Sequence, residues 1–138
     1  MALRDKTCCF TGHRDIPAAE LPELRHKLEV TVAELIQSGI RFFGSGGARG
    51  FDLEATKIVL EFRNRCPQVR LILVLPCRDQ AERWNREDRA EYERLKALAD
   101  KVVYTAERYT PGCMRRRNRH LVDGSSVCVA YCTRGTGG

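Results

Sequence analysis

The sequence predicts an α/β fold, a Rossmann-like three-layer sandwich with helices on both faces of a mainly parallel five-stranded sheet. Strand-like and helix-like segments alternate along all 138 residues, which is the order typical of parallel sheets. The run VRLILVL at 69–75 is apolar on both faces, as a central parallel strand is. Glycine or proline ends several strand-like runs. We expect the strand order 3-2-1-4-5, which reverses between the first and fourth strands.

The first half of the chain predicts three strands and two helices. The first strand is predicted at 7–10 and the second at 40–44. Between them, leucine, valine and isoleucine recur at helical spacing over 21–36, which predicts the first helix. A second amphipathic stripe predicts a helix around 55–62, and the third strand is the apolar run at 69–75.

The second half continues the alternation. Residues 79–99 predict a helix, but the segment is so polar that either the helix is largely solvated or its first part is a loop. A fourth strand is predicted at 101–105, a helix at 111–123 and a fifth strand at 126–132. We expect one Rossmann-like domain over residues 1–138 that lacks the usual C-terminal helix, as a truncated chain would. A second copy of the chain or another protein would then cover the exposed part of the sheet.

Composition excludes several classes of protein. No apolar run is long enough to span a membrane, and the N-terminus has no signal-peptide pattern, so we expect a cytoplasmic location without membrane contact. The seven cysteines are irregularly spaced without a C-x-x-C pair, and the three histidines are scattered. We therefore predict reduced thiols, no metal site and no cofactor. The net charge of +6 favours anionic partners such as nucleotides or nucleic acid.

Polar residues and glycines follow each predicted strand, and in a parallel sheet these loops meet at one edge, where ligands bind. The candidate ligand-binding residues are Gly12, His13 and Arg14 after the first strand; Gly44, Ser45, Gly46, Gly47, Arg49, Gly50 and Asp52 after the second; Pro76 and Gln80 after the third; Arg117 and Asn118 after the fourth; and Gly135 and Thr136 after the fifth. No residue is assigned a catalytic role.

The glycine-rich stretch 44–52 matches neither common phosphate-binding motif. A G-x-G-x-x-G motif would need glycine where Arg49 stands, and no Gly-Lys-Ser/Thr follows for a Walker A loop. Bare backbone amides and the start of the next helix can still approach an anion. Asp52 would either cap that helix or accept a hydrogen bond from a ribose hydroxyl, and Arg49 would either pair with a phosphate or lie exposed.

The segment CMRRRNRHLVD places polar residues on an apolar helix stripe. Arg117 and Asn118 share the stripe of Met114, so they face inward or toward the rim, either to a ligand or to internal hydrogen bonds. The remaining arginines form a solvated face or a nucleic-acid patch. Trp84 either stacks on a base or sugar or anchors its segment to the core.

Five motifs in order, TCCFTGHR, GGARGFD, LPCRDQAERW, RYTPGCMRRRNRHLVDGS and VAYCTRGTGG, resemble the YpsA-like family of the SLOG superfamily. The resemblance spans nearly the whole chain and implies a Rossmann-like fold with a pocket for a nucleotide-derived ligand. Related SLOG branches include phosphoribohydrolases and the single-stranded DNA-binding protein DprA. The phosphoribohydrolase motif P-G-G-x-G-T-x-x-E ends in a catalytic glutamate, whereas the matching stretch here, TRGTGG, has none.

We therefore expect the protein to bind or sense a nucleotide-derived, phosphate-bearing small molecule. One alternative is hydrolysis of a nucleotide, for which Asp52 and Asp123 are the candidate acids. Another is single-stranded nucleic-acid binding, which is less favoured because exposed aromatic residues are not interleaved with the arginines. Whether the chain catalyses a reaction, which ligand it takes and whether it forms a homo-oligomer all stay open at this point.

Overall fold

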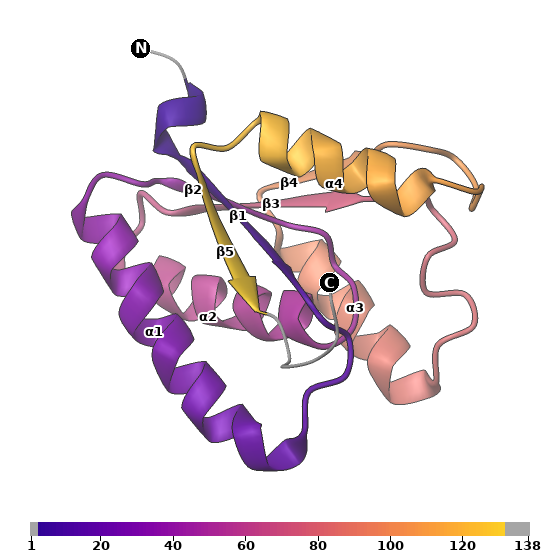
Figure 1. Ribbon diagram of the computed structural model, residues 1–138, viewed down its shortest axis with the longest axis horizontal. Coiled ribbons are helices and arrows are strands. Elements are labelled where there is room, and N and C mark those ends of the chain that lie inside the picture. The colour runs from indigo at the N-terminus through magenta and orange to yellow at the C-terminus, as the bar shows by residue number, and fades with distance from the viewer. Residues whose placement is uncertain (1–2, 132–138) are drawn as a thin grey trace.

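The computed structural model describes residues 3–131, and within them five parallel strands form one sheet (Figure 1). The strands are β1 (Thr7–Gly12), β2 (Phe42–Ser45), β3 (Arg70–Leu75), β4 (Lys101–Tyr104) and β5 (Val127–Tyr131). All neighbouring pairs are parallel. The predicted α/β, Rossmann-like fold is therefore confirmed.

Four α-helices connect the strands: α1 (Leu21–Gln37), α2 (Phe51–Arg65), α3 (Arg86–Leu98) and α4 (Cys113–Asp123). Two short 3₁₀ turns, η1 (Leu3–Lys6) and η2 (Ala18–Glu20), precede β1 and α1. The helices α1, α2 and α3 cover one face of the sheet, and α4 lies alone against the other face, where it packs on β3 and β1 (Figure 1). Among the described residues, no helix is long and apolar enough to cross a bilayer.

The predicted strand order 3-2-1-4-5 was wrong, because the observed order is β4-β3-β2-β1-β5. Asp100, between α3 and β4, explains where β4 goes. Its backbone N–H donates to the carbonyl of Leu71 (2.9 Å), and its carboxylate accepts from the N–H of Leu71 (2.8 Å). The chain that leaves α3 is thus already attached to the free edge of β3, where β4 forms. Helix α4 then crosses the other face of the sheet and leads into β5, beside β1. The order reverses between β1 and β5.

The segment before α3 settles an alternative that the sequence left open, and the start of α4 differs slightly from its prediction. The polar stretch that follows β3 is a loop up to Asn85, and α3 begins at Arg86. The Asn85 side chain caps that helix, since its Oδ1 accepts from the N–H of Asp88 (2.8 Å). The next helix, α4, starts at Cys113 behind Gly112, slightly later than predicted.

The main core lies between the sheet and the three helices α1–α3. Phe10, Phe43 and Phe51 are almost fully buried there, with ring centroids 6.1 Å apart for Phe10–Phe43 and 6.2 Å for Phe10–Phe51. A much smaller cluster, built around Cys9, Val74 and Leu121, lies under α4. The carboxyl ends of β1, β2 and β3 are consequently fixed by the larger core, which makes them a rigid base for the loops that follow.

Candidate functional site

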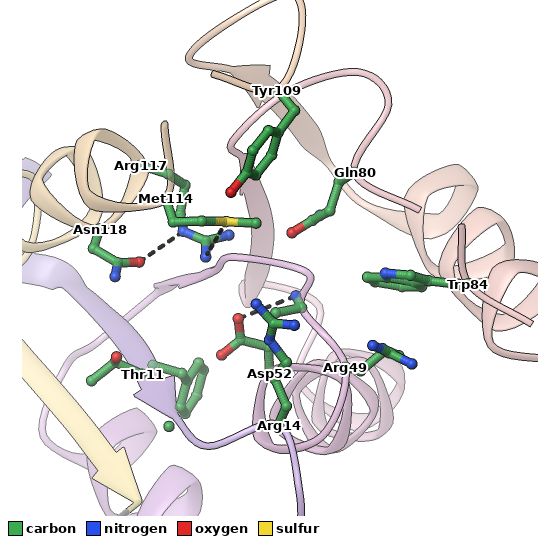
Figure 2. A pocket seen from close by; sticks show the side chains of 13 residues that line it. Thr11, Arg14, Arg49, Asp52, Gln80, Trp84, Tyr109, Met114, Arg117 and Asn118 are labelled. Atoms are coloured by element: carbon green, nitrogen blue, oxygen red, sulfur yellow. Dashed lines mark hydrogen bonds between the residues drawn. The ribbon is translucent and has the colours of Figure 1, made fainter. Parts of the chain in front are cut away.

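A cavity of about 420 Å³ opens at the carboxyl edge of the sheet (Figure 2). The connections that follow β1, β2, β3 and β4 all contribute to it, so the predicted convergence of loops is observed for these four strands. The loop predicted after β5 lies outside the described residues. The lining residues come from β1 and the turn after it, from the β2–α2 loop and the start of α2, from the β3–α3 loop, and from the β4–α4 loop with the first turns of α4. They are Phe10, Thr11, Gly12, Arg14, Ala48, Arg49, Asp52, Gln80, Trp84, Tyr109, Met114, Arg117 and Asn118.

The structure brings about half of the predicted site residues to this cavity. Those that line it are Gly12, Arg14, Arg49, Asp52, Gln80, Arg117 and Asn118. Those that do not line it are His13, Gly44, Ser45, Gly46, Gly47, Gly50 and Pro76. Gly135 and Thr136 lie outside the described residues.

Glycines of the 44–50 stretch make room for protein atoms rather than for the cavity. A Cβ on Gly46 would overlap the guanidinium of Arg117. A Cβ on Gly50 would overlap the backbone carbonyl of Arg14, and Gly50 has a φ of +82°, which L-residues rarely adopt. The bare backbone therefore lets the two arginines sit close to the loop, while Ala48 and Arg49 are the loop residues that reach the cavity.

Hydrogen bonds beneath the cavity hold this loop on the first turn of α2. Ser45 Oγ donates to the backbone carbonyl of Asp52 (3.3 Å) and accepts from the hydroxyl of Thr56 (2.9 Å) and the N–H of Gly47 (3.3 Å). Ser45 and Thr56 are fully buried. Ser45, a predicted ligand residue, thus supports the loop from behind. The backbone carbonyl of His13 accepts from the N–H of Phe51 (3.1 Å), which ties the turn after β1 to the same helix.

Asp52 supplies a buried carboxyl group at the base of the cavity. Its Oδ2 accepts from the N–H of Ala48 at 3.2 Å. Burial raises the pKa of Asp52 to about 6, although the nearby Arg117 guanidinium and the Ala48 N–H favour the ionised form. The side chain can therefore accept a hydrogen bond from a ligand hydroxyl when ionised, or donate one when protonated, within the physiological range of pH.

Arg117 reaches the cavity from α4 and is only 5% exposed. It donates to the carbonyl of Gly46, to Oδ1 of Asn118 (2.8 Å) and weakly to Sδ of Met114 (3.7 Å). Burial lowers the pKa of Arg117, and the carboxyl of Asp52 opposes that effect. A guanidinium has five N–H donors, so these contacts leave donors for a ligand. The inward direction predicted for Arg117 is observed, and Asn118 lies at the exposed rim.

Two further guanidinium groups lie at the mouth of the cavity. Arg14 is exposed, and no carboxylate of the described residues lies within ion-pair distance of it. Arg49 stacks over the ring of Trp84, with 5.4 Å from Cζ to the ring centroid, and its nearest carboxylate oxygen, on Asp88, is 3.9 Å away. Within residues 3–131, Arg14 therefore has no ion-pair partner and Arg49 has a long one.

The sequence interpretation missed five residues that line the cavity: Phe10, Thr11, Ala48, Tyr109 and Met114. Tyr109 is 63% exposed, and Figure 2 shows its hydroxyl directed into the cavity. Its backbone N–H donates to Oδ1 of Asp79 (3.0 Å), which fixes the β4–α4 loop against the loop after β3. An aromatic side chain in a loop that follows a strand was the available signal. Trp84, which the sequence left between two roles, both lines the cavity and packs edge-on against Tyr92 at 5.1 Å.

Among the described residues, no three histidine, cysteine, aspartate or glutamate side chains lie close enough together to hold a metal ion. Guanidinium, carboxyl, amide and aromatic groups line the cavity. Such a set can bind an anion and a planar ring and can orient a hydroxyl group.

Comparisons with known proteins agree with this architecture. The model of the YspA SLOG family matches residues 9–134. A UPF0398 protein of Bacillus pumilus is 28% identical over 119 residues, which span 85% of this chain and 63% of that protein. The uncharacterized SPbeta prophage-derived protein YoqJ of Bacillus subtilis is 26% identical over 121 residues, which span 78% of this chain and 71% of that protein.

A solved structure of DNA processing protein A from Helicobacter pylori, described for its single-stranded DNA binding mode, shares the fold. Its TM-score is 0.63 at 18% sequence identity, and the match covers 97% of this chain and 58% of that chain. The chain thus spans less than two thirds of the length of that protein and of the Bacillus pumilus relative.

Proposed function

The chain belongs to the YspA SLOG family, and we propose that it binds a nucleotide-derived small molecule that carries a phosphate group. The observation that carries this proposal is the composition of the cavity wall. Three guanidinium groups, those of Arg14, Arg49 and Arg117, line the cavity together with the carboxyl group of Asp52 and the indole of Trp84. A nucleotide offers a matching set of groups: an anion, a sugar hydroxyl and a flat base.

The size and openness of the site support a small ligand. The volume of about 420 Å³ lies within the range of about 300–1,000 Å³ that is usual for small-molecule sites. A phosphate beside Arg14 would pair with a guanidinium that has no carboxylate partner among the described residues. Charge-assisted hydrogen bonds of this kind are stronger than those between neutral groups. A mononucleotide would then reach from the exposed mouth to the buried carboxyl group.

Asp52 and Arg117 give the floor of the cavity its hydrogen-bonding capacity. One oxygen of Asp52 is used by Ala48, which leaves the other for a ribose hydroxyl. Arg117 is held in place by Gly46 and Asn118 before any ligand enters, so little side-chain entropy is lost on binding. Both groups are therefore preorganised.

The test is calorimetric titration of the purified chain with AMP, ADP and ribose 5-phosphate at low salt. We expect saturable binding, and we expect Arg14→Gln to weaken it about tenfold or more, because a charge-assisted contact to phosphate is lost. Arg41→Gln is the matched control, since Arg41 is also exposed but lies before β2, at the opposite end of the strands. No heat with any of the three compounds, or an equal loss in both variants, would reject the proposal.

A second candidate function is binding of single-stranded nucleic acid. It is favoured by the position of Arg115, Arg116 and Arg119, which are all exposed on α4, and the similar DNA processing protein A is described for this activity. Combined charge reversal of the three arginines should abolish oligonucleotide binding and its steep salt dependence while leaving nucleotide titrations unchanged. Unaltered oligonucleotide affinity in that variant would remove this candidate.

A further inference from the structure

We propose that Gln80 makes the cavity selective for nucleobases that carry an exocyclic amino group, such as adenine and cytosine. This inference rests on the proposed nucleotide binding and adds the class of base. It starts from one atom, Oε1 of Gln80, which is buried and is the only buried side-chain nitrogen or oxygen of the described residues without a hydrogen-bond partner. Buried polar atoms normally have partners, so an unpaired one at a cavity wall calls for an explanation.

The hydrogen bond of the amide nitrogen of Gln80 determines which atom of the amide has no partner. Nε2 of Gln80 donates to the hydroxyl of Tyr92 at 3.3 Å. Tyr92 is 2% exposed and packs against Trp84, so its ring cannot turn away easily. With Nε2 engaged there, the carbonyl oxygen of the amide is the atom that points toward the cavity (Figure 2). The unpaired group of Gln80 at this wall is therefore an acceptor.

Trp84 and Tyr109 lie to either side of Gln80 along this wall (Figure 2). The indole of Trp84 is half-buried and is supported from behind by Tyr92, with ring centroids 5.1 Å apart. A planar base stacked on such a surface gains favourable contact with every base type, so stacking alone does not discriminate. It does bring the hydrogen-bonding edge of the base toward the amide of Gln80.

The chemistry of the base edge then decides affinity. An exocyclic amino group donates and would satisfy Oε1, which removes the penalty of an unpaired buried acceptor. A keto oxygen at the same place is itself an acceptor, so it would leave both oxygens unpaired and facing each other. A site built in this way discriminates against the analogue that lacks the donor.

The test compares two matched pairs of ligands by calorimetry: AMP with IMP, and CMP with UMP. Each pair differs where an amino group replaces a keto group, and the two pairs together separate a purine from a pyrimidine requirement. We expect the amino-bearing member of at least one pair to bind about tenfold more tightly. Gln80→Met, which keeps the length of the side chain but has no amide, should remove that preference. Gln80→Glu, which keeps an acceptor, should retain it.

Controls separate this inference from the proposed function. Gln37→Met is the matched variant, because Gln37 is exposed at the end of α1, away from the cavity, and it should leave the preference intact. Equal binding of AMP and IMP and of CMP and UMP by the wild type, with ribose 5-phosphate also bound, overturns the inference alone. Tighter binding of IMP and UMP overturns it as well, since the amide would then present its donor. Absence of binding by all five compounds overturns both proposals.

Discussion

Replacing Gly50 with alanine is expected to lower the free energy of unfolding by about 2–4 kcal/mol. The backbone of Gly50 has φ +82° and ψ −123°, a region that costs a residue with a side chain about 1–3 kcal/mol. The added methyl group would also overlap the backbone of Arg14, which cannot swing aside as the end of a side chain can. The turn after β1 must shift, which breaks the bond from Phe51 N–H to the His13 carbonyl and costs about 1 kcal/mol more.

Gly112→Ala is the matched control for this variant. Gly112 also has a positive φ, +84°, but no atom lies within 4 Å of the position that its Cβ would occupy. Only the backbone penalty applies there, about 1–2 kcal/mol. Urea unfolding followed by circular dichroism gives the free energy of unfolding of both variants. In a thermal scan, a chain of this length with the Gly50 substitution should melt about 10 °C below the wild type. Equal losses in the two variants would refute the argument from close backbone approach.

Three further outcomes are expected. Burial raises the pKa of Asp52 to about 6, so the stability that its protonated form contributes is complete below about pH 4 and is lost as the pH rises through about 6. Asp52→Asn lacks this loss, so its free energy of unfolding should gain about 3 kcal/mol relative to the wild type across that pH range. Parallel curves of stability against pH for the two proteins would contradict this. Arg117→Met removes the positive charge that favours ionised Asp52, so carboxyl NMR titration should give a pKa above about 6, and an unchanged value would show that the two groups are uncoupled. Burial raises the pKa of Cys8 to about 12 and that of Cys9 to about 11, so in the native protein iodoacetamide at pH 8 should label the exposed Cys128 and spare these two, as peptide mass mapping would show.

Local sequence patterns were sufficient to predict the elements but not their arrangement. The apolar run of β3 and the helical stripe of α1 are short-range signals, and each appears close to its predicted place. The strand order depends instead on pairings between distant segments. The contact of Asp100 with Leu71, which attaches β4 to β3, leaves no periodic trace in the sequence.

In the site, too, local patterns were predictable from the sequence and contacts between distant segments were not. Arg117 was recognisable because a charged residue on an apolar helix stripe must find partners. The roles of the glycines were not recognisable, since the sequence shows that a side chain is missing but not which neighbour fills the space. Gly46 accommodates Arg117 and Gly50 accommodates Arg14, and both neighbours come from other parts of the chain. Tyr109 was missed because its one signal, an aromatic residue in a loop after a strand, does not show that the side chain is directed into a cavity.

The position of β1 between β2 and β5 has a consequence during translation. β1 is made before the other strands of the sheet, yet β5, the strand on its second side, is the last of the described strands to be made. Ser126, at the entry to β5, hydrogen bonds to Thr7 across 119 positions of sequence. Until then one edge of β1 exposes its backbone N–H and C=O groups beside the apolar run Cys8–Phe10, and a nascent chain in that state can pair with a neighbouring polypeptide. Pairing of β5 with β1 covers this edge and so removes a place where another chain could add.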